Sequence, residues 1–477
     1  MNLKVVGHTL GKMSLLLSLT LIFPLFISII DHSPDSKGFF FTILLGIVLG
    51  LILSLIKHDS KIGRKEGFAI VGLTWIYLSA LGAMPFFFSE VAPTYTDAFF
   101  ESMAGFTTTG ATILTDIESV PRGILFWRSL TQWLGGMGII ILSLAVFSFK
   151  GASLFQAEIP GHTPDRILPR LKQTAKTLWF IYAGLSLAEI LLLKLAGLSL
   201  FDSLIHTFST MSTGGFSSRN LGIKAYHNPY IETVIVLFML LAGMNFSLHY
   251  RALQKKKLTP FILDPETKSY FGIISISTLI IMFTLCLRMN IPLATAFRRS
   301  IFQVVSIITT TVFYNDNFNL WPPLAQGILF LLMFVGSCTG STSGSIKIGR
   351  LIILFKYARR RISKTLRPRQ VMQTKVGPSS IPDSVIHEIL TFFFLYIVIF
   401  AFGALVVMAT GEEIFTSIMA SAASIGNFGS AFGGVAPLEN YASMHAVAKW
   451  TLCFLMLAGR LELMTILVLF HPGFWRK

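Results

Sequence analysis

Charge and cysteine are both scarce in this sequence. Only 13% of its 477 residues are charged, whereas 53% are hydrophobic; soluble domains carry about 25% charged residues. Cys286, Cys338 and Cys453 each lie in an apolar segment, so they do not indicate a disulfide framework, and no pair has zinc-site spacing. The shortage of charge excludes a soluble domain and indicates a polytopic, all-α membrane protein.

Acidic residues are scarcer than basic ones. The chain has 39 Lys and Arg against 23 Asp and Glu, a net charge of +16. A nucleic-acid partner would explain this, but the basic residues cluster in short loops between apolar segments, as the positive-inside rule expects of cytoplasmic loops. These loops are 57–65, 150–176, 251–257 and 356–375. We therefore predict membrane lipid as a partner and no nucleic acid.

The loop from Lys356 to Lys375 contains several basic residues and no acidic one. Two interpretations stay open for it. One is an anchor on anionic lipid head groups, and the other is a docking surface for a cytoplasmic partner.

Catalytic signatures are also missing. His206 and the His387-Glu388 pair are accompanied by no metal-binding motif and no nucleophile–base grouping. We predict that the protein is not an enzyme and has no catalytic residues.

Loops rich in glycine and hydroxyl side chains recur four times between apolar segments. The fullest copy runs from Gly105 to Thr112, and looser copies surround Thr213, Thr311 and Ile425. Aligning positions 110, 214, 312 and 426 gives one unit of roughly a hundred residues. The sequence therefore predicts a fourfold internal repeat.

Each repeat is predicted to hold a span, a half-span, a loop and a second span. Two leading spans occupy 1–60, and the four repeats occupy 61–150, 151–257, 258–375 and 376–477. The ten spans are expected near 10–30, 39–56, 68–88, 124–149, 177–197, 230–250, 270–288, 323–357, 389–409 and 446–470. Counting spans places both termini and the basic loops in the cytoplasm, with the four loops opening on the other side.

The half-spans are too short to cross a bilayer, so each must dip in and return. Their loops must then be buried against one another or line water, which favours a pseudo-fourfold arrangement around one pore. The short helices direct partially negative carboxyl ends at its centre, and this favours a cation. A filter needs a ring of oxygen ligands, for which we predict Thr108, Thr109, Gly110, Ser212, Thr213, Gly214, Thr310, Thr311, Val312, Ser424, Ile425, Gly426 and Asn427.

A run of small residues at 336–346 interrupts the span predicted at 323–357. Each glycine costs about 1 kcal/mol in a helix interior, so we expect the helix to break there, beside a cavity. Close helix packing through the glycine spacing is the alternative. As a gate on the cytoplasmic side of the filter we predict Gly336, Gly340, Ser343, Gly344, Ser345 and Lys347.

Arg460 lies in the middle of the last predicted span, where an arginine costs about 2.5–3.5 kcal/mol on insertion scales. One interpretation is a structural ion pair with Glu462 or Glu189. The other places Arg460 at the pore as an electrostatic barrier that contributes to gating. For Asn245 and His249 we expect hydrogen bonds between helices rather than a ligand role.

Several runs resemble the TrkH family, the membrane subunits of bacterial potassium uptake systems in the Trk/Ktr/HKT superfamily. They are 97–112, 127–138, 243–250, 344–347 and 459–463, in the same order as in the family. The resemblance implies four span–pore–span repeats around a potassium pathway, gated by the loop at 336–346 with Arg460 nearby. It also implies a homodimer in the bacterial inner membrane, controlled by a TrkA-like cytoplasmic ring that supplies the only nucleotide site. No covalent cofactor is expected.

The third repeat departs from the family pattern, because Val312 stands where glycine follows the threonines. A β-branched residue disfavours positive φ, so this loop is expected to present its carbonyls differently. Our hypothesis is weaker discrimination of potassium over sodium. The alternative is that neighbouring contacts hold Val312 in a workable extended conformation.

The function predicted from these features is channel-like potassium uptake, with potassium bound in the filter. The alternative is a potassium symporter coupled to sodium or protons. Coupling needs a second site at mid-membrane, and Glu189 is the one isolated candidate in the sequence.

Overall fold

The computed structural model describes residues 1–56, 63–150, 171–367, 369, 372–377 and 379–476. The described chain is helical except for β1 (Thr374–Val376) and β2 (Ser379–Ile381), which form an antiparallel hairpin. The all-helical prediction is thus confirmed apart from this hairpin. Much of the basic loops 57–65 and 150–176 lies outside the described residues.

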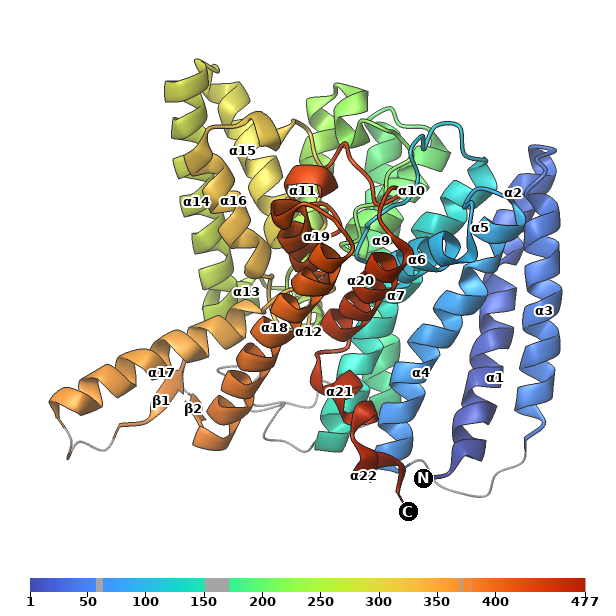
Figure 1. Ribbon diagram of the computed structural model, residues 1–477. Coiled ribbons are helices and arrows are strands. Elements are labelled where there is room, and N and C mark those ends of the chain that lie inside the picture. The colour runs from blue at the N-terminus through green and yellow to red at the C-terminus, as the bar shows by residue number, and fades with distance from the viewer. Residues whose placement is uncertain (57–62, 151–170, 368, 370–371, 378, 477) are drawn as a thin grey trace.

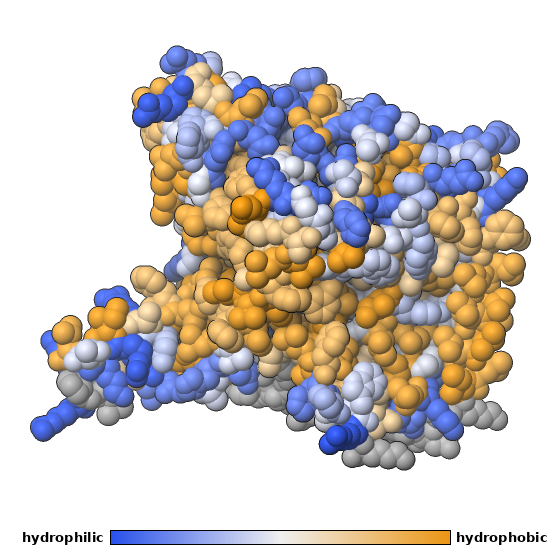
Figure 2. Space-filling model, viewed as in Figure 1, coloured by the Kyte–Doolittle hydropathy of each residue, from blue (hydrophilic) through white to orange (hydrophobic). Residues whose placement is uncertain are grey.

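Six helices of the described chain are long and apolar enough to cross a membrane, or seven if one bent pair counts as a span. The six stretches are Leu3–Ile30, Ser36–Ser54, Lys65–Phe88, Thr174–Leu195, Pro265–Met289 and Asp383–Ala409. They comprise α1 (Leu3–Thr20) with α2 (Ile22–Ile30), α3 (Ser36–Ser54), α4 (Arg64–Gly82) with α5 (Met84–Phe88), most of α9 (Leu171–Leu195), α14 (Pro265–Met289) and α18 (Asp383–Ala409). Figure 2 shows the matching apolar belt between two polar ends.

The remaining predicted spans are helical but more polar or interrupted. They correspond to α7 (Arg122–Lys150), α11 (Pro229–Ala242) with α12 (Phe246–Lys255), α16 (Pro323–Phe334) with α17 (Ile348–Leu366), and α20 (Ala446–Arg460) with α21 (Met464–Phe470). The expected break between α16 and α17 is confirmed. The continuous helices expected at 230–250 and 446–470 are wrong.

Local contacts explain the two unexpected breaks. Asn245 accepts a hydrogen bond from the Ser247 amide at 2.8 Å and so starts a new helix, and α11 and α12 meet at 96°. In the last predicted span, Glu462 and Leu463 both have positive φ, 60° and 46°, a region that ends a right-handed helix.

Four short helices, called here the pore helices, precede the glycine-rich loops. They are α6 (Tyr95–Phe106), α10 (Leu200–Met211), α15 (Leu293–Ile308) and α19 (Ile414–Gly426). Thr94 and Ser199 cap the first two by accepting the amides of Asp97 and Asp202. At 12 to 16 residues and about 1.5 Å per residue, none spans the ~30 Å of a bilayer core.

Short elements complete the fold: η1 (Gly222–Tyr226), α13 (Thr259–Leu263), η2 (Phe318–Leu320), η3 (Gly433–Val435) and α22 (Pro472–Trp475). In Figure 1, α1 and α3 form one edge of the molecule, and both chain ends lie at the same end of the helices. The helix α17 projects away from the body as an arm.

Candidate functional site

The four loops after the pore helices share one backbone conformation. A residue with left-handed φ starts each loop: Thr108 (51°), Thr213 (56°), Thr310 (58°) and Asn427 (53°). Two positions later φ is positive again: Gly110 (80°), Gly215 (81°), Val312 (51°) and Gly429 (65°). Equal conformations at equal spacing identify equivalent positions in the four repeats.

Hydrogen bonds to the pore helix give the same register. The Thr108 amide donates to the Gly105 carbonyl at 2.9 Å, and the Thr310 amide donates to the Ile307 carbonyl at 2.9 Å. The amides of Thr213 and Asn427 make the same bond to Thr210 and Ser424. Each loop therefore begins by capping its own helix, in the manner of a left-handed C-terminal cap.

This register corrects the sequence alignment. The partners of Gly110 are Gly215 and Gly429, whereas the sequence pattern had selected Gly214 and Gly426. Ser424, Ile425 and Gly426 form the last turn of α19 and precede the fourth loop, which begins at Asn427. Sequence reasoning therefore missed Gly215, Phe428 and Gly429, because it matched glycines by identity instead of counting from the helix end.

The loops meet one another in a ring. A Cβ added to Gly110 would lie 2.0 Å from the Gly214 oxygen, and one on Gly215 would lie 1.9 Å from the Thr311 oxygen. A Cβ on Gly429 would lie 2.5 Å from the Thr109 oxygen. The first loop thus touches the second, the second touches the third, and the fourth returns to the first. We call each contact between neighbouring loops a seam. At three seams of the ring, glycine is required both for the close approach and for the positive φ.

The expected conformational difference at Val312 is not present. Its φ of 51° lies in the same left-handed region as that of the three glycines, and it is not extended as the alternative supposed. A β-branched residue in this region is strained, by roughly 1–3 kcal/mol. The surrounding ring therefore imposes the conformation that the side chain opposes.

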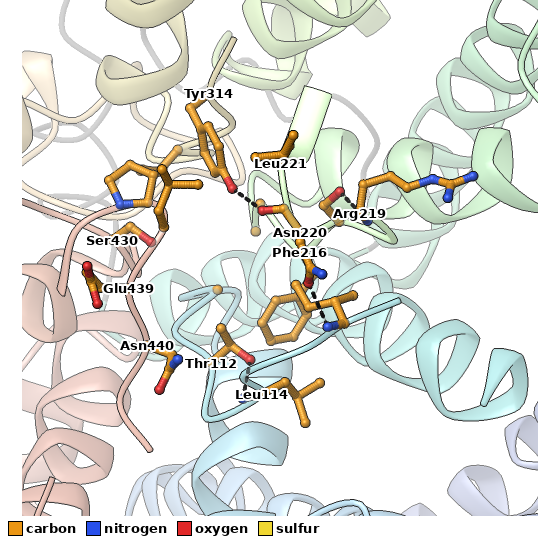
Figure 3. Close-up of a pocket in the computed structure, with 18 of the residues that line it drawn as sticks. Thr112, Leu114, Phe216, Arg219, Asn220, Leu221, Tyr314, Ser430, Glu439 and Asn440 are labelled. Atoms are coloured by element: carbon orange, nitrogen blue, oxygen red, sulfur yellow. Dashed lines mark hydrogen bonds between the residues drawn. The ribbon is translucent and has the colours of Figure 1, made fainter. Parts of the chain in front are cut away.

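A cavity of about 160 Å³ opens above the ring and is lined by residues of all four repeats. Thr109, Gly214, Thr311 and Phe428 contribute to its wall. In Figure 3, Thr112, Phe216, Tyr314 and Glu439 approach it from different parts of the chain. Its volume holds several water molecules.

Asn220 joins the outer ends of the first two loops. Its side chain donates to Asp116 at 2.7 Å and accepts from the Ile117 amide at 2.7 Å. The hydrogen bond from Asn220 lowers the pKa of the Asp116 carboxyl. Tyr314 of the third repeat donates to the Asn220 carbonyl at 2.6 Å, so three repeats meet at this residue (Figure 3).

The segment between α16 and α17, residues 335–347, lies against the ends of the pore helices. The side of the ring that it contacts is called here the inner side. The Gly344 amide donates to the Thr310 hydroxyl at 2.8 Å, and the Ser345 amide donates to the Gly426 carbonyl at 3.0 Å. The Thr342 hydroxyl donates to the Met211 carbonyl at 3.1 Å. This segment thus touches the ends of three pore helices or their loops, which places Gly344 and Ser345 beside the ring.

The other predicted gate residues hold the segment's own shape. The Gly336 amide donates to the Ile346 carbonyl at 2.9 Å and closes its base. A Cβ on Gly340, whose φ is 73°, would lie 3.1 Å from the Asn245 side chain. Lys347 donates to the hydroxyls of Ser341 and Ser343 at 3.2 and 2.9 Å.

Glu266 is a residue of this region that sequence reasoning missed. Its Oε1 accepts from the Thr339 amide at 2.8 Å, the Thr339 hydroxyl at 2.9 Å and the Gly349 amide at 2.7 Å. One buried carboxylate therefore clasps both sides of the segment. The available signal was an acidic residue in the first turn of α14, just after the helix-capping Asp264.

Arg460 reaches the same segment. It is 3% exposed, and its guanidinium donates to the Thr342 carbonyl at 2.6 Å. In the described part of the chain it pairs with no carboxylate: Glu462 pairs with Arg350 at 2.8 Å, and neither Glu189 oxygen has a hydrogen-bond partner. The ion-pair interpretation of Arg460 is therefore wrong.

His249 makes the expected hydrogen bond between helices, whereas Asn245 caps its own helix, α12. His249 Nε2 lies 2.9 Å from the Leu241 carbonyl and links α12 to α11. Cys338 donates its amide to the Gly243 carbonyl at 3.0 Å. The segment 335–347 is thus bound at the unexpected break between α11 and α12 in the second repeat.

Comparison with known proteins agrees with this architecture. The chain matches a family model described as TrkH, cation transport protein, over residues 35–477. It is 38% identical to the Trk system potassium uptake proteins TrkH of Salmonella typhimurium and Escherichia coli, over 100% of each chain. It resembles the crystal structure of the potassium transporter TrkH from Vibrio parahaemolyticus, with a TM-score of 0.92 and 32% identity over 100% of both chains. This chain is therefore a multi-span membrane protein, not an enzyme, and it belongs to the TrkH family of cation transport proteins.

Proposed function

We propose that the protein takes up potassium by a channel-like pathway through the ring of four loops. The observation that carries this proposal is the repeated left-handed conformation of the four loops around one cavity. Backbone and hydroxyl oxygens so arranged replace the hydration shell of an ion. The relatives named above are potassium uptake proteins.

The ion-binding residues that we propose follow the corrected register. Each loop supplies three consecutive residues to the filter: Thr108 to Gly110, Thr213 to Gly215, Thr310 to Val312, and Asn427 to Gly429. Four further residues lie at the ends of the pore helices and position these loops: Ser212, Ser424, Ile425 and Gly426.

We place the gate at the segment 335–347. It lies against Thr310 and Gly426 on the inner side of the ring, so its displacement would open the path below the filter. Arg460 adds positive charge beside it, which opposes cation passage while the segment is in place.

The assembly that we propose is a homodimer in the bacterial inner membrane, with ten spans, cytoplasmic termini and the four repeats bounded as predicted above. A TrkA-like nucleotide-binding ring would control the gate from the cytoplasm. Both chain ends lie on one side of the molecule (Figure 1), as an even number of spans requires.

Val312 bears on selectivity through its side chain rather than its φ. At the other three seams a neighbouring carbonyl lies within 2.5 Å of the place of a Cβ, closer than any real Cβ tolerates. Val312 carries a Cβ, so the backbone of the fourth loop must stand farther away there. We propose that this wider seam weakens discrimination of potassium over sodium.

Coupled symport with sodium or protons is the second candidate. Glu189 favours it, because this carboxyl is fully buried in α9 and neither oxygen has a hydrogen-bond partner in the described structure. A buried carboxyl of this kind is a natural proton or second-ion site.

Flux measurements on the purified chain in proteoliposomes test the proposal. We expect potassium flux whose reversal potential follows the potassium gradient alone. A reversal potential that shifts with the proton or sodium gradient would favour symport, and the shift would disappear in Glu189→Gln. Absence of potassium flux in the presence of the regulatory ring would refute both functions.

A further inference from the structure

The run at 127–138, which carries part of the family resemblance, forms the first half of α7, behind the second pore loop. Arg128 and Gln132 are four residues apart and therefore share one face of this helix. Their exposures are 2% and 0%. Two buried polar side chains inside a membrane protein need partners, and both find them in the loops of the ring.

Gln132 holds the second loop by its backbone. Its Nε2 donates to the Gly214 carbonyl at 2.7 Å, and its Oε1 accepts from the Phe216 amide at 3.2 Å. These two groups flank Gly215, the residue with φ of 81°. The amide of Gln132 also fills the space beside Gly214, where a Cβ would lie 2.4 Å from it.

Arg128 extends the same contact outward. Its guanidinium lies 3.6 Å from the centre of the Phe216 ring and donates to the Ser217 carbonyl at 3.2 Å. It also pairs with Glu101 of α6 at 2.5 Å. Glu101 in turn accepts from the Ile113 amide at 2.9 Å and from the Thr112 hydroxyl. One network therefore joins the exit of the first loop to the backbone of the second.

The other pore helices have no charged counterpart of Glu101. Seven residues before the left-handed residue of each loop stand Glu101, His206, Gln303 and Ala420. His206 contacts Tyr226, and neither amide atom of the buried Gln303 has a hydrogen-bond partner in the described chain. The network is thus specific to the seam between the first and second loops.

We propose that Gln132, backed by the Arg128–Glu101 pair, is a specificity-determining residue that fixes the width of the ring. The Gly214 carbonyl lies against Gly110 of the first loop, so holding that carbonyl sets the distance between the two loops. A ring that cannot contract fits the smaller sodium ion poorly and therefore favours potassium. This inference rests on the proposed potassium pathway.

The test compares Gln132→Met with Gln303→Met in the full chain, reconstituted in proteoliposomes with separate potassium and sodium fluxes. Both replacements remove a fully buried amide at similar volume, but only Gln132 binds the backbone of a loop. We expect Gln132→Met to keep potassium flux and to lower the potassium-to-sodium ratio about tenfold, the size of one buried hydrogen bond. Gln303→Met should keep the native ratio.

A native ratio in Gln132→Met, or an equal fall in Gln303→Met, would overturn the inference and leave the proposed function standing. A native chain without potassium flux in the presence of the regulatory ring would overturn both. If Gln132→Met does not fold, Gln132→Asn serves instead, because it keeps an amide but is one methylene shorter and so withdraws the donor from the Gly214 carbonyl. Its ratio should also fall, and a native ratio there would contradict the proposal.

Discussion

At the residue scale, the ring depends on backbone conformations that most side chains avoid. Thr108, Thr213, Thr310 and Asn427 adopt left-handed φ without being glycine. Such residues persist only where the surrounding structure over-determines them, and they concentrate at functional sites. The strain is thus distributed over four equivalent positions rather than one.

Gly215→Ala should abolish transport. The added Cβ would lie 1.9 Å from the Thr311 oxygen, so the second and third loops must separate. The alanine would also have to adopt a φ of 81°, which is unfavourable for any residue with a Cβ. Potassium flux in proteoliposomes measures the loss. Gly272→Ala is the matched control, because a Cβ at this helical position meets nothing within 4 Å and alanine favours a helix by about 1 kcal/mol.

Val312→Gly should raise the potassium-to-sodium flux ratio. Glycine lets the third loop approach the fourth as closely as the other seams do, and it relieves left-handed strain of about 1–3 kcal/mol. We therefore also expect higher thermal stability in detergent. An unchanged flux ratio would refute the wide-seam explanation even if the stability rises.

At the scale of elements, the helix breaks in the second and third repeats satisfy each other's backbone hydrogen bonds. The segment 335–347 exposes backbone groups that a membrane cannot satisfy. Gly243 and Ala242, at the end of α11, accept the amides of Cys338 and Thr342 at 3.0 and 3.4 Å, and Phe246, at the start of α12, donates to the Gly340 carbonyl at 3.1 Å. A break in one helix therefore supplies the partners that the other break needs.

Glu266→Ala should raise potassium flux in the absence of a regulatory ring. It leaves the Thr339 amide, the Thr339 hydroxyl and the Gly349 amide without their acceptor, and each buried orphan group costs about 1–3 kcal/mol. The loosened segment 335–347 should then leave the inner side of the ring more often.

Glu388→Ala, which removes an exposed carboxylate of α18, is the control and should leave flux unchanged. Glu266→Gln keeps one oxygen acceptor and should give an intermediate flux. Native flux in Glu266→Ala would argue against a clasp.

At the scale of the whole molecule, contacts between distant repeats close the ring. Asn427 of the fourth repeat donates to the Thr109 hydroxyl of the first at 2.9 Å. Lys449 of α20 pairs with Asp97 of α6 at 2.6 Å, with side chains 6% and 9% exposed. These contacts join residues from opposite ends of the sequence, so the ring cannot assemble until the last repeat is in place.

Lys449→Met should lower the free energy of unfolding by about 3–5 kcal/mol, because it leaves the Asp97 carboxylate buried without its charge partner. Thermal unfolding in detergent measures the effect. Adding Asp97→Asn should recover most of the loss, since the uncompensated charge is then gone.

The exposed pair of Arg122 and Asp31 is the control for that experiment. These side chains are 55% and 25% exposed, so Arg122→Met should change stability by less than about 1 kcal/mol. Equal losses of unfolding free energy in Lys449→Met and Arg122→Met would show that the buried pair stabilises the protein no more than the exposed one.

The sequence alone determined the membrane class, the recurrence of four loops and the break at 336–346. Each follows from local composition: apolar runs, glycine clusters and polar groups inside a span. Local patterns could not give the loop register, because Gly214 and Gly426 look like the partners of Gly110 until one counts from the end of the pore helix.

Only the tertiary structure decided the partners of the buried polar groups. Glu266, Gln132 and Arg460 bind backbone carbonyls and amides of segments far away in the sequence, and no local pattern encodes such a pairing. The same holds for Val312: its own preference opposes positive φ, yet the ring around it imposes 51°. The strain of this conformation is about 1–3 kcal/mol, and many packed contacts outweigh it.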